Sequence, residues 1–153
     1  MKWITRERPK TDRIACPWLI GKFIDPKAEI VFVPADQVLK TTAALGGRSF
    51  DAPDADFGHR PARDGQPEWC TFETLIDVFN LGGDAALARL AKIVHAADID
   101  RDLATNPAGA GLRAIGLGGL DVEEDDQVLL KRGSFVYDAL YAWCAQQDGT
   151  VAA

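Results

Sequence analysis

The sequence predicts an α/β or α+β fold, with a small, partly parallel sheet in the N-terminal third and a predominantly helical C-terminal half. The first fifty residues alternate β-branched and aromatic segments with apolar patterns of helical spacing. After Cys70, apolar residues recur at helical intervals only. A length of 153 residues with 47% hydrophobic side chains suffices for one core, so we expect a single domain over residues 1–153.

Strands and helices are expected to alternate in the N-terminal third. The expected strands are Lys2–Arg6, Glu29–Val33 and 48–51. A helix that begins at Thr11 or Asp12 has its apolar residues on one face, and Pro26 follows its end. A second helix is expected over 35–45, where two glycines close it. Because a helix separates each strand from the next, neighbouring strands should run parallel.

The C-terminal half is divided into helices by capping residues and glycines. The expected helices are 72–80 after Thr71, 85–97 after Asp84, a glycine-rich helix from Asn106, 123–132 ending at Gly133, and a last helix capped by Ser134. The loop 52–68 between the halves is rich in proline, aspartate and glycine. Loops of this length inside a compact domain are more often functional than incidental.

Composition argues against several classes of protein. A net charge of −6 argues against broad non-specific nucleic-acid binding, which needs a basic face. No apolar run approaches the roughly 18 residues that span a bilayer, and the charged N-terminus does not resemble a signal peptide. Three separated cysteines make a poor disulfide framework and indicate a cytoplasmic protein. The scattered glycines form no dinucleotide fingerprint, so no nucleotide cofactor is indicated.

Basic side chains concentrate near the N-terminus, where a strand is expected to meet a helix. Arg6, Arg8 and Arg13 lie in this stretch. Guanidinium groups offer forked donors and a helix N-terminus adds free backbone N–H groups, so the junction suits an oxyanion. The alternative is that these arginines form surface ion pairs with Glu7, Asp12 and other acids.

Both histidines of the chain lie near carboxylates. On the helix expected at 85–97, His95 and Asp98 lie beside the apolar stripe on neighbouring turns of one face. Glu73 and His59 complete a candidate ligand set for one divalent ion, which would be zinc, iron or manganese. We therefore predict that the two histidines converge on one metal site. The alternative is a hydrogen-bonded interior histidine, with acids that serve only their own helix ends.

Cys16 is the cysteine with a candidate chemical role as a reactive thiol. It follows Arg13 by one helical turn, and a nearby guanidinium charge favours the thiolate. The alternative is a small apolar side chain in the core beside Ala15 and Trp18.

Several stretches of the chain carry a family resemblance. They are TRERPKTDRIACPWLIGKFIDPKAEIVFVPADQV, FGHR, CTFETLIDVF, LARLAKIVHAADID and YDALYAWC. Over about 3–144 they resemble the chromate-resistance family, more narrowly the C-terminal domain of the chromate-responsive regulators of bacterial chromate-efflux operons. The resemblance implies a chromate-responsive binding domain, in which Arg6 and Arg13, with Arg8, would bind the dianion and His59 would add a donor. The arginines alone imply only an oxyanion, because sulfate and phosphate have the same shape.

The longer regulators of this family carry a separate N-terminal domain. We therefore expect no direct nucleic-acid binding from this chain alone, no membrane partner, and either a homo-oligomer or a complex with a separate regulator. Two further function classes stay open. One is a metal-dependent hydrolase or oxidoreductase built on the His/Glu/Asp set, which an open coordination position would favour. The other is an interaction module for a separate regulator, which a large exposed apolar patch would favour.

Overall fold

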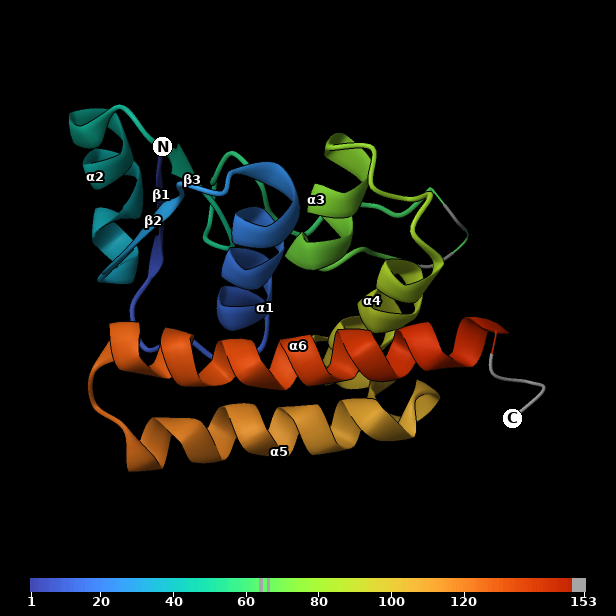
Figure 1. The fold of residues 1–153 in the computed structure, drawn as a ribbon. Helices are drawn as coiled ribbons and strands as arrows, with labels where there is room; N and C mark the ends of the chain where they lie inside the picture. The colour runs from blue at the N-terminus through green and yellow to red at the C-terminus, as the bar shows by residue number, and fades with distance from the viewer. Residues whose placement is uncertain (64, 66, 150–153) are drawn as a thin grey trace.

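The computed structural model describes residues 1–63, 65 and 67–149. Positions 64 and 66 of the expected loop, and positions 150–153 of the expected domain, lie outside this range. The described chain is α+β, as predicted, with a small parallel sheet in its N-terminal part and mostly helix after it (Figure 1).

The sheet has the strand order β2-β1-β3, and both of its strand pairs are parallel. Its strands are β1 (Lys2–Arg6), β2 (Glu29–Val33) and β3 (Arg48–Ser49). β1 lies between the other two strands, and its central residues Trp3, Ile4 and Thr5 are buried. β3 is shorter than the strand predicted at 48–51, because Phe50 pairs beyond it only through an isolated bridge to a loop residue.

Helices account for most of the remaining chain. They are α1 (Asp12–Leu19), α2 (Val38–Leu45), α3 (Thr71–Val78), α4 (Ala85–Asp98), α5 (Pro107–Val122) and α6 (Asp126–Gly149). α1 continues as a π-helical turn over Ile20–Ile24. Short 3-10 segments, Ala35–Gln37 and Asp100–Thr105, precede α2 and join α4 to α5. Among the described residues, no helix has both the length and the apolar character that crossing a bilayer requires.

The C-terminal helices α4, α5 and α6 pack together with α1 and α3. Figure 1 shows α5 and α6 running antiparallel, with α1 and α3 on the other side of α6 from α5. α4 packs against both α5 and α6, and α1 packs against α6 and α3. The large buried side chains at these contacts include Trp18, Phe72 and Tyr137. This packing fixes the first turns of α1 and α3 and the last turn of α4 relative to the sheet.

The predicted break between two helices at Gly133 and Ser134 is wrong, because α6 is continuous there. A Cβ on Gly133 would lie 2.7 Å from Cγ2 of Ile14, so this glycine permits α1 and α6 to approach closely. The Ser134 hydroxyl donates to the carbonyl of Leu130 at 2.8 Å, which is the behaviour of a serine inside a helix rather than at its N-cap.

Candidate functional site

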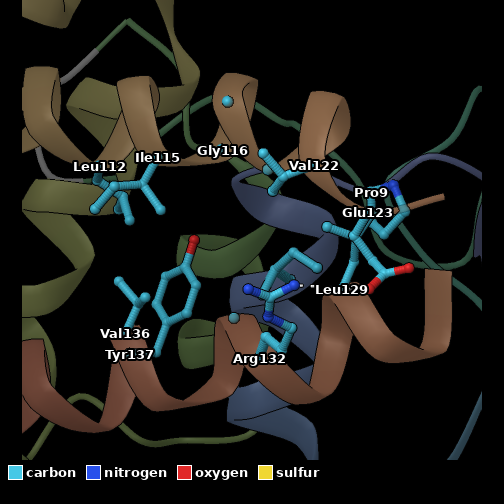
Figure 2. A pocket seen from close by; sticks show the side chains of 14 residues that line it. Pro9, Leu112, Ile115, Gly116, Val122, Glu123, Leu129, Arg132, Val136 and Tyr137 are labelled. Carbon is cyan, nitrogen blue, oxygen red and sulfur yellow. Dashed lines mark ion pairs between the residues drawn. The ribbon is translucent and has the colours of Figure 1, made fainter. Parts of the chain in front are cut away.

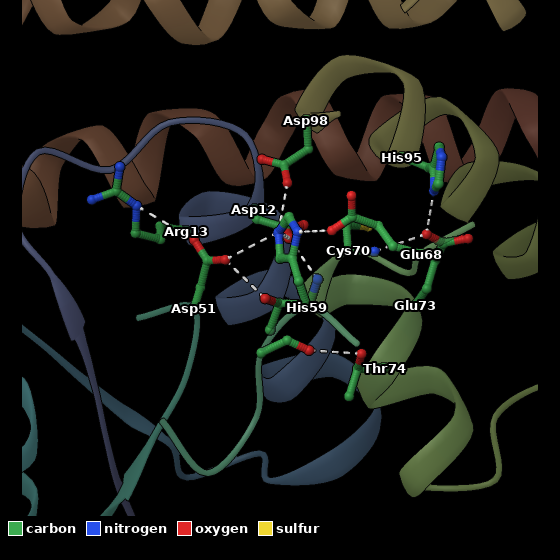
Figure 3. A network of polar contacts seen from close by, with 12 residues as sticks. Asp12, Arg13, Asp51, His59, Glu68, Cys70, Glu73, Thr74, His95 and Asp98 are labelled. Carbon is green, nitrogen blue, oxygen red and sulfur yellow. Dashed lines mark hydrogen bonds and ion pairs between the residues drawn. The ribbon is translucent and has the colours of Figure 1, made fainter. Parts of the chain in front are cut away.

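Polar side chains from distant segments meet beside the carboxyl ends of β1 and β3 (Figure 3). Asp51 follows β3, Asp12 opens α1, Asp98 ends α4, and His59 comes from the loop before α3. We call these four residues the His59 cluster. Ligands of open parallel sheets commonly bind outside the carboxyl ends of the strands, so the position suits a binding site.

The imidazole of His59 lies at the centre of this cluster. Its Nε2 lies 3.0 Å from Oδ2 of Asp98 and 3.7 Å from both Oδ2 of Asp12 and Oδ1 of Asp51. Its Nδ1 lies 3.2 Å from Oε2 of Glu68. The contacts with the carboxylates of Asp12 and Asp98 raise the pKa of His59 to about 11. In the cation-free cluster the ring is therefore protonated at neutral pH.

Asp12 is fully buried, which is rare for an aspartate. Its Oδ2 accepts the backbone N–H of Thr71 at 2.8 Å. Its Oδ1 is buried without any hydrogen-bond partner among the described residues. Burial raises the pKa of Asp12 well above its usual range, and the charge of Asp98 raises it further. An orphaned buried carboxylate oxygen is expensive, so it marks a position where a further group is expected.

Asp51 is held by two arginines. Arg6 donates through Nε to the Asp51 carbonyl at 2.8 Å and through its terminal nitrogen to Oδ2 at 3.3 Å. Nε of Arg13 lies 3.6 Å from the same oxygen. Thr71, expected as an N-cap, is instead the first residue of α3, and its hydroxyl donates to Oδ1 of Asp51 at 2.8 Å. Asp51 has a φ of 48°, a strained value for a non-glycine residue that these contacts maintain.

Arg8 lies apart from this group, at the connection between α5 and α6. Its guanidinium donates to the carbonyls of Leu120, Glu123 and Glu124 and to Oδ1 of Asp126, over 2.6 to 3.0 Å. A cation at the carbonyl end of a helix is favourable to its dipole. Arg8 therefore lies outside the group that Arg6, Arg13 and His59 form around Asp51.

A second group, which we call the His95 cluster, contains Cys70, Glu73, His95 and Asp102. Oε1 of Glu73 accepts the backbone N–H of Cys70 at 3.0 Å and lies 2.5 Å from Nδ1 of His95. Nε2 of His95 lies 2.7 Å from Oδ2 of Asp102. Burial lowers the pKa of His95, but its hydrogen bonds to Glu73 and Asp102 outweigh burial and raise the pKa above its ordinary value.

The four predicted metal ligands are thus divided between two clusters, contrary to the expectation of one shared site. His59 and Asp98 lie in one, and Glu73 and His95 lie in the other. Among the described residues, the two groups with metal-ligand spacing each contain one histidine. A separation of three residues leaves His95 and Asp98 about 60° apart around α4, so the two side chains contact different partners; Figure 3 shows this divergence.

Sequence reasoning missed four members of these clusters, which are Asp12, Asp51, Cys70 and Asp102. It also missed Glu68, which contacts His59. A signal existed for Asp12: it precedes Ala15 and Cys16 by three and four residues, so it falls on the face of α1 that was predicted to be buried. Glu68 lies in a loop and Asp102 lies in the short 3-10 segment before α5, so neither belongs to a long periodic pattern from which its position could be predicted.

The three cysteines are buried and outside any disulfide. Cys16 and Cys70 are completely inaccessible, and Cys144 is 1% exposed. Burial raises the pKa of the Cys16 thiol well above its ordinary value, and the charge of Asp12 raises it further. This environment favours the thiol over the thiolate, so the structure favours the packing interpretation of Cys16 over a reactive one.

Two cavities are relevant to binding. A cavity of about 680 Å³ opens at the His59 cluster, where its walls include Arg6, Asp51, His59 and Arg60. Arg60 is ion-paired with Asp77. A cavity of this size admits a small anion, and it brings cationic and anionic side chains to one surface.

The second cavity, of about 470 Å³, lies between α5 and α6 (Figure 2). Its walls are mainly apolar and include Leu112, Ile115 and Val136. The charged pair at its wall is Arg132 with Glu123, 3.6 Å apart. It lacks the converging polar groups of a catalytic or ion-binding site, so we place the candidate site at the His59 cluster.

Comparison with known proteins identifies the family. The sequence model of the family described as ChrB, C-terminal domain, matches residues 3–144. The chain belongs to this family. Protein ChrB of Cupriavidus metallidurans (strain ATCC 43123 / DSM 2839 / NBRC 102507 / CH34) is 34% identical over 140 residues, covering 92% of this chain and 40% of that protein. The chain therefore spans about two fifths of the length of this relative.

The resemblance to the chromate-resistance family is confirmed by these two matches. No solved structure matches the ChrB-type chain. The match includes both clusters, since residues 3–144 contain every member of the His59 and His95 clusters.

Proposed function

We propose that this chain is an oxyanion-responsive domain of the chromate-resistance type, which recognises chromate or a similar tetrahedral dianion through Arg6, Arg13 and His59. The observation that carries the proposal is the convergence of these three cationic groups, from three separate segments, around one carboxylate, that of Asp51. Forked guanidinium donors match tetrahedral oxyanions well. Family membership supports chromate as the oxyanion.

The carboxylate of Asp51 occupies the guanidinium donors that an oxyanion would use. A dianion that enters the cavity competes with Asp51 for Arg6, whose side chain is 36% exposed. Because Asp51 also accepts from Thr71 at the start of α3, its displacement would alter how α3 is anchored. Ligand binding is thereby coupled to the position of a helix, which is a physical basis for a response.

The direct test is replacement of the exposed arginine. Arg6→Ala should weaken the binding of chromate by about tenfold or more, because a charge-assisted hydrogen bond contributes roughly 1.5–3 kcal/mol. Isothermal titration calorimetry with chromate, sulfate and phosphate measures the affinity and ranks the anions. Arg132→Ala is the matched control, since Arg132 is also ion-paired to one acid but lies at the α5–α6 cavity.

Equal and small losses in Arg6→Ala and Arg132→Ala would contradict the proposal and leave the arginines as ion-pair partners of acids. A preference for sulfate or phosphate would retain the site but reassign its ligand. The enzyme and interaction-module alternatives gain no support from the comparisons and stay hypotheses.

A further inference from the structure

We propose that Asp12, His59 and Asp98, three members of the His59 cluster, form a binding site for one divalent metal ion. This inference rests on the proposed function, because the cation would bind carboxylates of the same site at which the oxyanion is proposed to bind. The proposed ligand set keeps His59 and Asp98 from the set predicted from sequence. Asp12 replaces Glu73 and His95.

The first argument is geometric. One oxygen or nitrogen atom from each of the three residues lies within 4.8 Å of the other two. Nε2 of His59 lies 3.0 Å from Asp98 and 3.7 Å from Asp12. Ligand atoms that surround an ion tetrahedrally at about 2.1 Å are about 3.4 Å apart, so these separations match the edges of a coordination shell.

The second argument is the unpartnered oxygen of Asp12. Oδ1 is buried and has no hydrogen-bond partner among the described residues, while Oδ2 accepts from the backbone of Thr71. No lysine or arginine in the described chain is ion-paired with Asp12 or Asp98, since Arg6 and Arg13 bind Asp51 instead. Asp12, which is buried, and Asp98, which is partly buried, therefore have the imidazolium of His59 as their directly ion-paired cation among the described residues.

Asp98 adds an electrostatic reason of its own. It is the last residue of α4, where the carbonyl end of the helix dipole disfavours a carboxylate. A metal ion between Asp98 and Asp12 would offset both the dipole and the repulsion between the two carboxylates. The imidazolium of His59 would lose its proton to become a ligand, since neutral imidazole is the form that binds metals.

The surroundings of His59 fit this role. Metal-binding histidines usually donate their other ring nitrogen to a carboxylate, which fixes the orientation of the ring. Nδ1 of His59 faces Glu68 at 3.2 Å, and Arg101 holds Glu68 at 2.6 Å. One imidazole and two carboxylates suit zinc, iron(II) or manganese(II).

A bound cation would also make the cluster more favourable to an anion. Without it, a dianion approaching Arg6 and Arg13 faces the carboxylates of Asp12, Asp51 and Asp98. A metal ion with three protein ligands retains an open coordination position for water or an oxyanion oxygen. We therefore infer that the metal increases oxyanion affinity.

The test is calorimetric titration of the chelator-treated protein with MnCl₂ and with ZnCl₂, in buffer free of chromate, sulfate and phosphate. We expect one equivalent to bind the wild type. Asp12→Asn and Asp98→Asn should each weaken binding by at least about tenfold, because they remove a direct ligand charge. Asp102→Asn is the matched control, since Asp102 contacts the histidine of the other cluster and should change the affinity less than about threefold.

Circular dichroism of each variant establishes that it is folded, and Asp98→Asn decides the question if Asp12→Asn does not fold. Failure of both metals to bind the wild type overturns the inference. An equal loss in Asp102→Asn also overturns it, and would place the ion at the His95 cluster. Metal binding without any oxyanion binding would leave the metal site standing and refute the proposed function instead.

Discussion

His95 is a buried histidine whose two ring nitrogens both face carboxylates, those of Glu73 and Asp102. Its pKa is raised because these contacts outweigh burial, so the folded state binds a proton more tightly than the unfolded state. The stabilisation is therefore complete below the unfolded value of about 6.5 and is lost as pH rises through the raised value.

We predict that His95→Gln lowers the free energy of unfolding by about 1.5–3 kcal/mol at pH 6, and that the difference from wild type narrows as pH increases. Urea denaturation between pH 6 and 9 measures this. His59→Gln in metal-free protein is the comparison: because the pKa of His59 is about 11, its stability difference from wild type should also narrow as pH rises above about 6.5, and should still be narrowing at pH 9. A pH-independent difference for His95→Gln would contradict the assigned charge.

At the residue scale, the sequence identified both histidines and some of the carboxylates beside them, but it assigned all of them to one site. Glu73 and His95 do meet, and so do His59 and Asp98. The division into two clusters depends on the direction of each side chain around α4 and on the path of the loop that carries His59. Neither is encoded in local spacing, which is why Asp12 and Asp102 were missed.

At the scale of elements, local signals predicted the starts of α4 and α5 correctly. Asp84 accepts the backbone N–H of Leu87 and opens α4, and Asn106 accepts that of Ala108 and opens α5, as their residue types predict. Gly133 was wrongly predicted to end a helix, because a glycine can either terminate a helix or permit a neighbouring helix to approach closely. Only the position of Ile14, more than a hundred residues away, distinguishes them.

Gly133→Ala should destabilise the protein by about 1–3 kcal/mol, because the new methyl group would force α1 and α6 apart. Thermal unfolding of the variant and wild type measures the loss. Gly118→Ala is the control: it lies within α5 with nothing near its Cβ position, so it should stabilise by roughly 0.5–1 kcal/mol through helix propensity. Equal shifts in both variants would refute close packing as the reason for Gly133.

At the scale of the whole molecule, Arg8 joins the N-terminal segment to the connection between α5 and α6. Its φ of 55° and its contacts with residues 112 to 118 positions away hold the segment after β1 against the α5–α6 connection. The sequence showed the basic cluster but not this role, because the carbonyl acceptors carry no side-chain signature.

Arg8→Lys should therefore lower the free energy of unfolding by about 1.5–3 kcal/mol although the charge is kept, since an ammonium group cannot reproduce the forked contacts. Chemical denaturation provides the measurement. Arg132→Lys, at a side chain that is 64% exposed, should change stability by less than about 0.5 kcal/mol. Equal stability of Arg8→Lys and Arg132→Lys would contradict the stabilising role of the Arg8 guanidinium at the α5–α6 connection.

The burial of all three thiols has a consequence for a protein of the chromate-resistance family. Chromium(VI) oxyanions oxidise thiols, and oxidation of cysteine depends on exposure and on thiolate character. Cys16, Cys70 and Cys144 are each almost inaccessible in the folded chain, and burial raises the pKa values of Cys16 and Cys70, which disfavours their thiolate forms. The fold thus shields these thiols from oxidising oxyanions, and their oxidation becomes limited by the small fraction of molecules that are unfolded at any moment.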